Sequence, residues 1–146
     1  MTISTAMTTI SNQKIAIIIA AAGSSTRMNL GCKKEYLPLQ EGTVLSTDAK
    51  AFLKTINISS ITVTVPKNGK NDAENAFFAD SEMKTLTENV KLHFIEGGKT
   101  RQESVYNGLS LLDDGICLIH DAARALIEKE EIEAVIENVG KYGAAA

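Results

Sequence analysis

The sequence predicts a doubly wound α/β domain built on a mostly parallel sheet. Along the 146 residues, stretches with the apolar pattern of a strand alternate with stretches that have the pattern of a helix. The run at 14–21 is almost continuously apolar, as in a strand that is covered on both faces. Such alternation favours parallel strand pairing, with helices on both faces of the sheet. The composition, 44% hydrophobic and 23% charged, is that of a globular domain.

Each predicted element has a local signal. Ile61, Val63 and Val65 lie two residues apart, and Pro66 ends that strand. Thr100 and Glu103 have the spacing of a capping box, which marks the start of a helix. Strands are expected at 14–21, 58–66, 90–96 and 116–120. Helices are expected at 43–55, in part of 71–89, at 100–112 and at 130–139.

The two ends of the chain carry weaker patterns. Residues 1–13 contain no charged side chain, and we expect a disordered tail there, ahead of a domain at 14–146. A secretory signal is the alternative, but it needs a basic segment, and only Lys14 and the terminal amine are positive. The small residues of 142–146 predict the beginning of a fifth strand, with a frayed tail as the alternative.

Charge and cysteine usage exclude several classes of function. The net charge is −3, from 15 basic and 18 acidic residues with no basic block, which disfavours nucleic-acid binding. No apolar run reaches the roughly 18 residues of a membrane span. Cys32 and Cys117 are too few and too far apart for a disulfide framework, so we expect a reducing compartment, the cytoplasm.

Chemically important residues lie in three segments, each of which follows a predicted strand: 20–27, 96–101 and 120–124. The carboxyl ends of parallel strands lie at one edge of a sheet, and ligands bind there. We therefore expect the three segments to meet in one site.

The first segment combines small residues with positive charge. Ala21, Ala22 and Gly23 let backbone amides approach an anion closely, and Arg27 and Lys34 add basic groups. This combination suits a polyphosphate. The alternative is a tight turn with solvated Lys and Arg side chains. The dinucleotide-binding pattern GxGxxG is missing.

The second segment, Gly97-Gly98-Lys99-Thr100, invites comparison with a P-loop. That motif needs a glycine five residues before Gly98, where the chain has His93. We therefore do not expect a P-loop here. Glycines ahead of a capped helix can still hold a ligand through backbone contacts, and a plain helix-entry turn is the alternative.

The third segment places Asp121 directly after an apolar strand, a common position for a carboxylate that holds Mg²⁺ beside phosphates. For His120 we favour a satisfied, partly buried side chain over a catalytic one, and we expect the Cys117 thiol to be an inert core group. The three segments thus offer backbone donors, positive charge and one carboxylate without a covalent nucleophile. That set fits nucleotidyl transfer by direct attack of one phosphate on another.

These motifs resemble a known family. AAGSSTRM at 21–28, KKEYLPL at 33–39, EGGKTRQESVYNGL at 96–109 and HDAAR at 120–124 are similar to blocks of methylerythritol phosphate cytidylyltransferases, in the same order and spacing. The family makes the cytidine diphosphate derivative of methylerythritol from its 4-phosphate and CTP, a step of isoprenoid precursor synthesis. The resemblance implies a nucleotide-diphospho-sugar transferase fold, Rossmann-like, with 14–146 as its CTP-binding part.

The resemblance also implies roles for individual residues. Arg27 and Lys34 match a catalytic basic pair that stabilises the pentavalent α-phosphate and the leaving pyrophosphate. Asp121 matches an aspartate associated with Mg²⁺, and Arg124 matches an arginine near the sugar-phosphate pocket. Arg101 matches an arginine that mainly supports its loop. The positions that hold the cytosine and its ribose are Ala21, Ala22, Gly23, Gly98 and Ser104.

The chain departs from the family pattern at a few positions. Ser25 replaces a common glycine, Lys33 a frequent proline, Lys99 a frequent aspartate and Ala125 the usual proline. The family domain also continues with further strands and a dimerisation arm that completes the acceptor pocket in a homodimer. We therefore expect the polypeptide ending at Ala146 to be incomplete at its C-terminus, and unstable or inactive alone.

Three other functions remain open at this point. The acceptor is expected to be 2-C-methyl-D-erythritol 4-phosphate, but a sister enzyme uses ribitol 5-phosphate. The chain could instead be an inactive remnant that at most binds nucleotide. A P-loop-like module is the third alternative, in which Lys99 would be needed for ATP or GTP binding.

Overall fold

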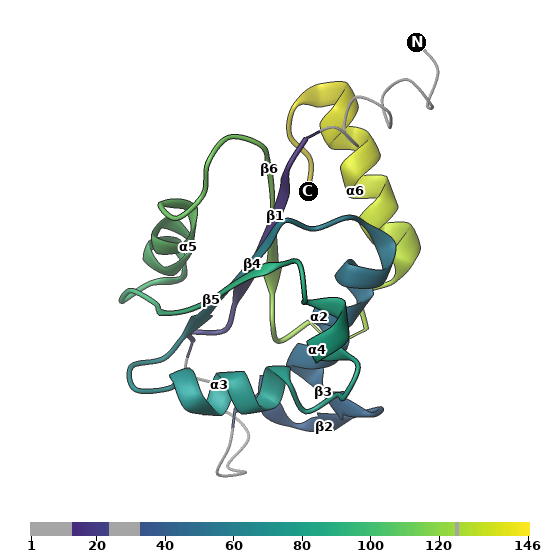
Figure 1. The fold of residues 1–146 in the computed structure, drawn as a ribbon. Coiled ribbons are helices and arrows are strands. Elements are labelled where there is room, and N and C mark those ends of the chain that lie inside the picture. The colour runs from purple at the N-terminus through teal and green to yellow at the C-terminus, as the bar shows by residue number, and fades with distance from the viewer. Residues whose placement is uncertain (1–12, 24–32, 125) are drawn as a thin grey trace.

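The computed structural model of the protein describes residues 13–23, 33–124 and 126–146. Its centre is a sheet of four strands, all parallel, in the order β5-β4-β1-β6 (Figure 1). This confirms the predicted fold class and all four predicted strands. The strands are β1 (Ile15–Ala20), β4 (Ser60–Val65), β5 (Lys91–Glu96) and β6 (Ile116–Asp121).

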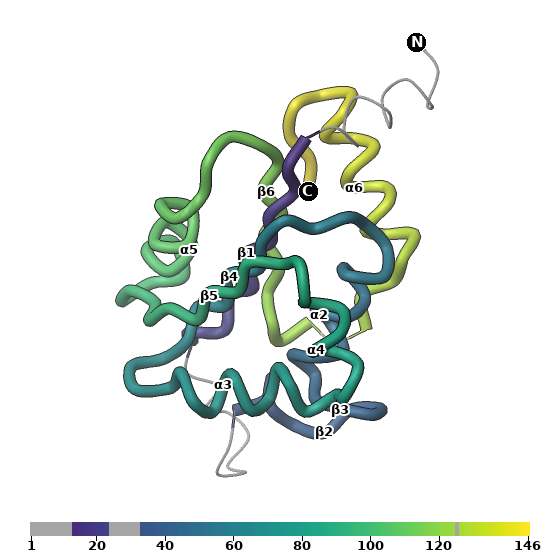
Figure 2. Tube along the Cα trace, viewed as in Figure 1, coloured from purple at the N-terminus to yellow at the C-terminus, as the bar shows by residue number. Residues whose placement is uncertain are grey.

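Helices cover both faces of this sheet, as a doubly wound fold requires. Figures 1 and 2 show α5 alone on one face, with the other helices on the opposite face. The helices are α2 (Val44–Thr55), α3 (Lys70–Phe77), α4 (Met83–Leu86), α5 (Arg101–Leu109) and α6 (Lys129–Tyr142).

The two faces of the sheet are packed differently. Ile17, Ile61 and Leu118 are register partners on the face that carries most of the hydrophobic core. On the α5 face, Ile18 and Thr62 are fully buried, and Gly108 of α5 approaches so closely that an added Cβ would lie 3.0 Å from Ile18 Cδ1. The glycine therefore permits the close contact between α5 and β1 that brings the start of α5 to the end of the sheet.

Helix α2 begins at a well-formed cap. Thr43 Oγ1 accepts a hydrogen bond from Ser46 N at 3.2 Å, and Ser46 Oγ accepts one from Thr43 N at 2.8 Å. From there Leu45, Ala49 and Phe52 form the buried stripe that the sequence predicts. Asp48 lies on the same buried side and is only 1% exposed.

Three features differ from the sequence prediction. A short hairpin of β2 (Pro38–Leu39) and β3 (Gly42–Thr43), and the 3₁₀ helix η2 (Lys34–Tyr36), were not predicted because elements of two or three residues have no periodicity. The predicted fifth strand is wrong for the described chain: α6 runs on to Tyr142, and 144–146 adopt no regular structure. Gly143, with φ of 80°, ends α6 in the left-handed region that glycine favours.

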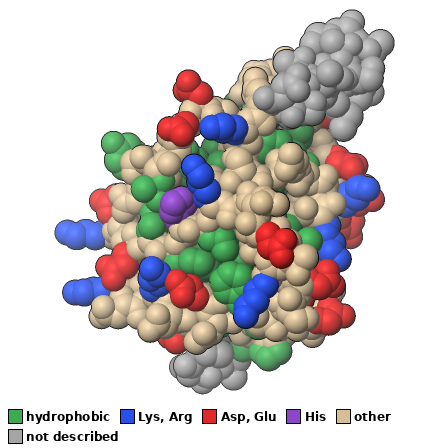
Figure 3. All heavy atoms as spheres, viewed as in Figure 1, with side chains coloured by type: hydrophobic (Ala, Val, Ile, Leu, Met, Phe, Trp, Pro, Cys, Tyr) green, Lys and Arg blue, Asp and Glu red, His purple; other side chains and the backbone are tan. Residues whose placement is uncertain are grey.

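Charged side chains of both signs lie close together on the surface. On the face drawn in Figure 3, Lys and Arg side chains lie among Asp and Glu side chains, without one extended patch of a single sign. No helix in the described part of the chain is long and apolar enough to cross a membrane. The predicted disordered tail at 1–13 lies, apart from the exposed Gln13, outside the described residues.

Candidate functional site

The strand order places a topological switch point between β1 and β6. The chain runs from β1 outward to β4 and β5, and then returns to add β6 on the other side of β1. Ala20 and Asp121, the last residues of β1 and β6, are register partners. A crevice forms beyond the carboxyl ends of the strands at such a point, and it is where open α/β sheets bind ligands.

The loops after β1 and β5 also meet, as the sequence predicts. A Cβ added to Gly97 would lie 2.4 Å from Ala22 Cβ and 2.4 Å from Ser104 Oγ. Only a residue without a side chain fits between the β1 loop and α5. Ala22, Gly97 and Ser104 therefore form one packed unit, and it contains two of the predicted nucleotide-binding residues.

The described part of the β1 loop is fixed at its base. The Ala21 amide donates to Thr64 O at 3.1 Å and lies 3.2 Å from Thr64 Oγ1, so the neighbouring strand holds it. Gly23 is exposed, and nothing lies within 4 Å of a Cβ added there. Among the described residues, the Cα of Gly23 is therefore not covered by a neighbouring side chain. Arg27, the predicted catalytic arginine, lies outside the described residues.

The side chain of Lys33 binds the backbone at the start of the β1 loop. Its Nζ donates to Gly23 O at 2.7 Å and also to Ala21 O, and it lies 5.8 Å from the centre of the Tyr36 ring. Burial lowers the pKa of Lys33, and the charge of Glu35 partly offsets that decrease. In the sequence, Lys33 stands out only as a departure from the family pattern, since no local pattern shows which carbonyls a lysine side chain reaches.

Lys34, the second predicted catalytic residue, is exposed and begins η2. The side chain of the next residue, Glu35, is buried, so η2 turns one side toward the interior while Lys34 stays at the surface. Burial, more than the nearby carboxylates Glu35 and Asp72, raises the pKa of Tyr36 to about 12, so this phenol stays neutral. Lys34 is thus placed beside the β1 loop through its direct neighbour Lys33.

Local hydrogen bonds hold the β5 loop. Gly98 N donates to Ser104 Oγ at 3.1 Å, and Ser104 Oγ donates to Thr100 O at 3.0 Å. Thr100 caps α5 as predicted, since its Oγ1 accepts from Glu103 N at 3.1 Å. The predicted reciprocal bond is displaced by one residue: Glu103 Oε2 accepts from Lys99 N, at 2.6 Å.

The same geometry answers the P-loop question. His93, where a P-loop needs glycine, lies within β5, and the strand continues to Glu96. Only Gly97 to Thr100 separate β5 from α5, which is too short a segment to wrap a phosphate chain. The structure therefore agrees with the expectation that this segment is not a P-loop.

The third loop places Asp121 and Arg124 at the switch point. Arg101 Nε donates to Asp121 Oδ1 at 2.8 Å, which links the start of α5 to the end of β6. The Arg124 amide donates to Asp121 O at 3.0 Å, and its side chain is exposed. Arg101 supports a loop, as its match in the family implies, but the loop it supports is the one after β6.

His120 is a buried, satisfied side chain, as predicted. Its Nε2 lies 3.0 Å from Asp48 Oδ2, and its ring packs edge-on against Phe52 with centroids 5.3 Å apart. Both partners come from α2. No local sequence pattern indicates Asp48 as the partner of His120, because the two residues lie 72 positions apart.

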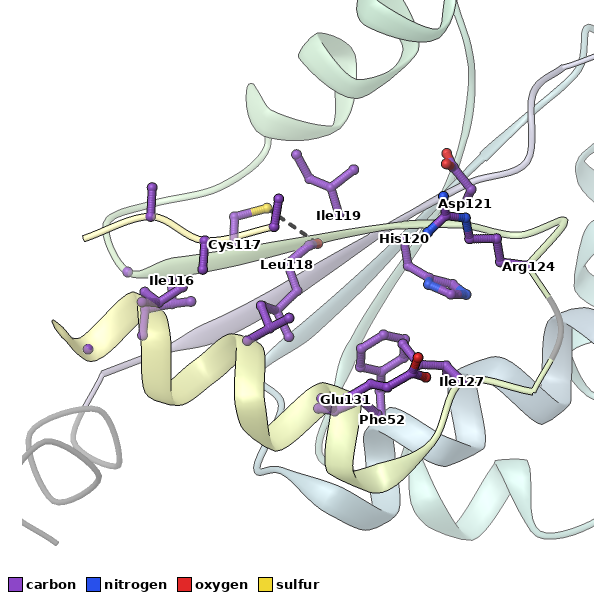
Figure 4. Close-up of a pocket in the computed structure, with 18 of the residues that line it drawn as sticks. Phe52, Ile116, Cys117, Leu118, Ile119, His120, Asp121, Arg124, Ile127 and Glu131 are labelled. Carbon is purple, nitrogen blue, oxygen red and sulfur yellow. Dashed lines mark hydrogen bonds between the residues drawn. The ribbon is translucent and has the colours of Figure 1, made fainter. Parts of the chain in front are cut away.

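A groove of about 1290 Å³ runs along the free edge of β6, between this strand and α6 (Figure 4). Asp121 and Arg124 lie at one end of the groove, and Leu118 points into it toward α6. Cys117 corrects one expectation, because it lies half-buried on this edge strand and not in the core. Burial raises the pKa of its thiol, which disfavours the reactive thiolate form.

The comparisons with known proteins agree with this geometry. Residues 15–146 match the family 2-C-methyl-D-erythritol 4-phosphate cytidylyltransferase. The chain belongs to this family. The match spans every strand and loop of the crevice, which confirms the resemblance that the motifs indicate.

Curated relatives carry the same name. The chain is 37% identical over 134 residues to the 2-C-methyl-D-erythritol 4-phosphate cytidylyltransferase of Clostridium novyi, covering 91% of this chain and 56% of that protein. It is 37% identical over 125 residues to that of Clostridioides difficile, covering 84% and 50%. The chain therefore spans about half the length of the curated relatives it matches.

Solved structures confirm the fold. The bifunctional IspDF from Campylobacter jejuni superposes with a TM-score of 0.66 at 33% identity, over 88% of this chain and 31% of that one. A UDP-glucose pyrophosphorylase superposes with a TM-score of 0.62 at 14% identity, over 88% and 52%, and at that identity shows the fold alone. The predicted nucleotide-diphospho-sugar transferase fold is thereby confirmed.

Proposed function

We propose that the protein acts in cytidylyl transfer: CMP passes from CTP to 2-C-methyl-D-erythritol 4-phosphate, and pyrophosphate is released. The observation that carries the proposal is the convergence of the β1, β5 and β6 loops at the switch point of a family member. A phosphate oxygen of the acceptor attacks the α-phosphorus in line. The bond from that phosphorus to the β-phosphate oxygen breaks, and pyrophosphate leaves with the electron pair.

The basic groups of the site supply the charge that this step needs. Arg27 and Lys34 are proposed to stabilise the negative charge that builds up on the α-phosphate and the leaving pyrophosphate. Lys34 is exposed beside the β1 loop, so it can reach a ligand held there. Lys33 is already engaged with backbone carbonyls, and it is therefore proposed to shape the loop. Preorganised charge of this kind is the main source of catalysis in phosphoryl and nucleotidyl transfer.

The cytidine is proposed to lie across the β1 and β5 loops. Ala21, Ala22 and Gly23 offer a small-residue surface, and Gly98 of the β5 loop and Ser104 of α5 lie next to it. Small side chains let the backbone come within hydrogen-bonding distance of a base or a ribose. Gly98 N and Ser104 Oγ are bonded to each other, so the β5 side of the pocket is already ordered.

Asp121 could hold a Mg²⁺ ion only together with the phosphates of a bound substrate. Among residues 13–23, 33–124 and 126–146, no three acidic, histidine or cysteine side chains form a metal cluster. Mg²⁺ in such sites is held by one or two carboxylates together with substrate phosphates, so Asp121 with a triphosphate suffices. When bound, the ion would neutralise phosphate charge. Arg101, which is paired with Asp121, would keep that carboxylate at the crevice.

The described residues account for less of the acceptor half of the site than of the nucleotide half. Arg124 lies at the end of the β6 groove and is proposed to contact the acceptor phosphate. A homodimer in the cytoplasm is proposed for the complete enzyme. A ribitol 5-phosphate acceptor is the alternative, and a substrate comparison must decide it, because these residues favour neither polyol.

The test is a coupled assay on the purified protein. CTP, Mg²⁺ and 2-C-methyl-D-erythritol 4-phosphate are supplied, and pyrophosphate and the cytidine diphosphate product are measured. Parallel reactions contain ribitol 5-phosphate, or ATP, GTP or UTP in place of CTP. Binding of CTP is measured separately by calorimetry. Lys34→Ala should lower kcat by roughly 10²–10³-fold, the effect of removing one oxyanion-stabilising group.

Each outcome separates two readings of the site. Turnover with CTP and methylerythritol phosphate, lost in Lys34→Ala, supports the proposal. CTP binding without turnover supports a nucleotide-binding role alone. Binding of ATP or GTP that Lys99→Ala abolishes would overturn the proposal in favour of a P-loop-like module.

A further inference from the structure

Asp48 is a buried carboxylate that the proposed chemistry does not use. It lies on α2, in the middle of the core-facing stripe, and its side chain is 0% exposed. Burial raises its pKa, and the hydrogen bond and charge of His120 partly offset that rise. A buried carboxylate is unfavourable unless other groups are arranged around it. Asp48 is thus an exception in a core that is otherwise mostly apolar.

The groups that favour the charged form of Asp48 lie at the end of β6 and in the residues that follow it. His120 contacts its Oδ2, and the backbone amides of Leu126 and Ile127 also favour its charged form. Oδ1 accepts no hydrogen bond of ordinary length from the described residues. The carboxylate is in this way bracketed by both ends of the segment 120–127.

The backbone of this segment is strained at one point. Leu126 has φ of 66°, which a residue with a branched side chain rarely adopts, and its side chain is 60% exposed. Such a conformation persists only where its surroundings hold it in place. A buried negative charge that attracts the amides of Leu126 and Ile127 provides that restraint. Ile127 then returns the chain to the edge of the core.

Phe52 adds a second contact from the same helix. It lies four residues after Asp48, one turn along α2, and its ring meets the His120 ring at an interplanar angle of 68°. Asp48 and Phe52 therefore hold the imidazole from two sides. The end of β6 cannot shift without separating His120 from both. Asp121 is the next residue, and Arg124 follows within the same segment.

We propose that Asp48 is a positioning residue: from α2 it holds His120 and with it the described residues 120–124, and thereby sets where Asp121 and Arg124 stand relative to the β1 loop. The inference rests on the proposed function for its consequence, which is weaker nucleotide binding when Asp48 is changed. Its structural part, the restraint on 120–127, is independent of that function.

The experiment uses amide hydrogen exchange, followed by NMR, on the full chain and on Asp48→Asn. Asn keeps the size of the side chain and can still contact His120, but it lacks the charge that attracts the two amides. We expect exchange at Ala122, Arg124 and Ile127 to become faster by about tenfold or more, with exchange in β1 and β4 unchanged. CTP affinity, measured by calorimetry, should fall in the same variant.

Asp80→Asn is the matched control. Asp80 is also buried, at 4% exposure, and forms a 2.9 Å ion pair with Lys50, which lies on α2 as Asp48 does. Its loss should affect stability without changing exchange at 120–127. His120→Gln is a second variant, which removes the ring contact with Phe52 and should also speed exchange in this segment. It keeps the test decisive if Asp48→Asn does not fold.

The outcomes are distinct. Faster exchange confined to 120–127, in either variant and not in Asp80→Asn, supports the positioning role even if the wild-type chain binds no CTP. In that case the proposed function fails and the structural inference stands. Unchanged exchange at 120–127 would overturn the inference. Faster exchange throughout the sheet would also overturn it, because Asp48 would then support only global stability.

Discussion

The β5 and β6 loops lie at the same edge of one sheet but are held by different kinds of contact. In the β5 loop, Gly98, Lys99 and Thr100 bond to Glu103 and Ser104, within six positions along the chain. In the β6 loop, the corresponding restraints come from far away. Asp48 contacts His120 across 72 positions, and Arg101 contacts Asp121 across 20.

This difference has a physical consequence. A loop whose side-chain hydrogen bonds are mostly local keeps much of its form whenever the adjoining helix forms, because one capped turn supplies those partners. A loop held by distant side chains keeps its form only while the tertiary packing is intact. The β5 loop is therefore a rigid wall of the crevice. The β6 loop is the part whose position depends on α2 and α5.

The largest expected effect breaks the long-range anchor. Asp48→Ala leaves the buried His120 ring without its hydrogen-bond partner, and the free energy of unfolding should fall by up to about 3 kcal/mol, the upper end of the cost of leaving a buried polar group unsatisfied. Urea unfolding followed by circular dichroism measures the change. The double variant Asp48→Leu with His120→Leu should recover much of the loss. A loss below about 1 kcal/mol in Asp48→Ala would show that the pair contributes little.

The next effect tests the packing between the β1 and β5 loops. A Cβ in Gly97→Ala would overlap Ala22 and Ser104, each at 2.4 Å, so the loops must move apart. We expect unfolding to become easier by about 2 kcal/mol, the usual result of overpacking. Gly23→Ala is the control, because nothing lies within 4 Å of its added Cβ. Equal stability of the two variants, measured by thermal unfolding, would contradict this packing.

A smaller effect is expected within the β5 loop itself. Thr100→Ala removes the oxygen that accepts from Glu103 N, and loss of such a cap costs about 1 kcal/mol. Thr100→Ser keeps that oxygen and should restore most of the stability in urea unfolding. Amide exchange in the Thr100→Ala variant should become faster at 97–104 and stay unchanged at 120–127. Coupled changes in both loops would contradict the contrast drawn between them.

The pH dependence of stability should distinguish the two buried aspartates, Asp48 and Asp80. Burial raises the pKa of Asp48 above 3.8, so the stability it contributes is present below 3.8 and is lost as pH rises through the folded-state pKa. The hydrogen bond from Lys50 lowers the pKa of Asp80 below 3.8, so its contribution is present above 3.8 and is lost as pH falls.

Comparing each Asn variant with the wild type over a pH series of urea unfolding therefore gives slopes of opposite sign. The difference between wild type and Asp48→Asn should decrease as pH rises above 3.8. The difference between wild type and Asp80→Asn should increase as pH rises toward 3.8. Slopes of the same sign would mean that Asp48 is stabilised by its partners more than it is penalised by burial.

The contrast between the loops also explains what the sequence could predict. The four strands, the start of α5 at Thr100 and the convergence of the loops all follow from local pattern and from the rules of parallel sheets. The contacts of Lys33 with the β1 loop and of Asp48 with His120 do not. They depend on which distant groups the packing brings together, and side chains of this type have no spacing that reveals their partners.

Sequence motifs predicted the candidate site more fully than the predicted helices and strands did. Ala22, Ser104 and Asp121 lie at the same edge of the sheet, as the three-segment pattern predicts, whereas the half-buried position of Cys117 and the end of α6 at Tyr142 were not foreseen. Cys117 is half-buried on a strand that is an edge strand among the described residues. An apolar run is the same in the sequence whether one or both of its edges are paired, so the pattern cannot tell the two cases apart.

The central claim is that the three loops form one CTP site. The most direct measurement is the set of backbone amide shifts that CTP causes in a nitrogen–proton NMR spectrum of the protein, with GTP as the comparison. The account predicts that CTP shifts amides at 21–23, 97–104 and 121–124 together, and that GTP shifts them far less. Shifts confined to one loop or to the β6 groove, or equal shifts with GTP, would contradict it.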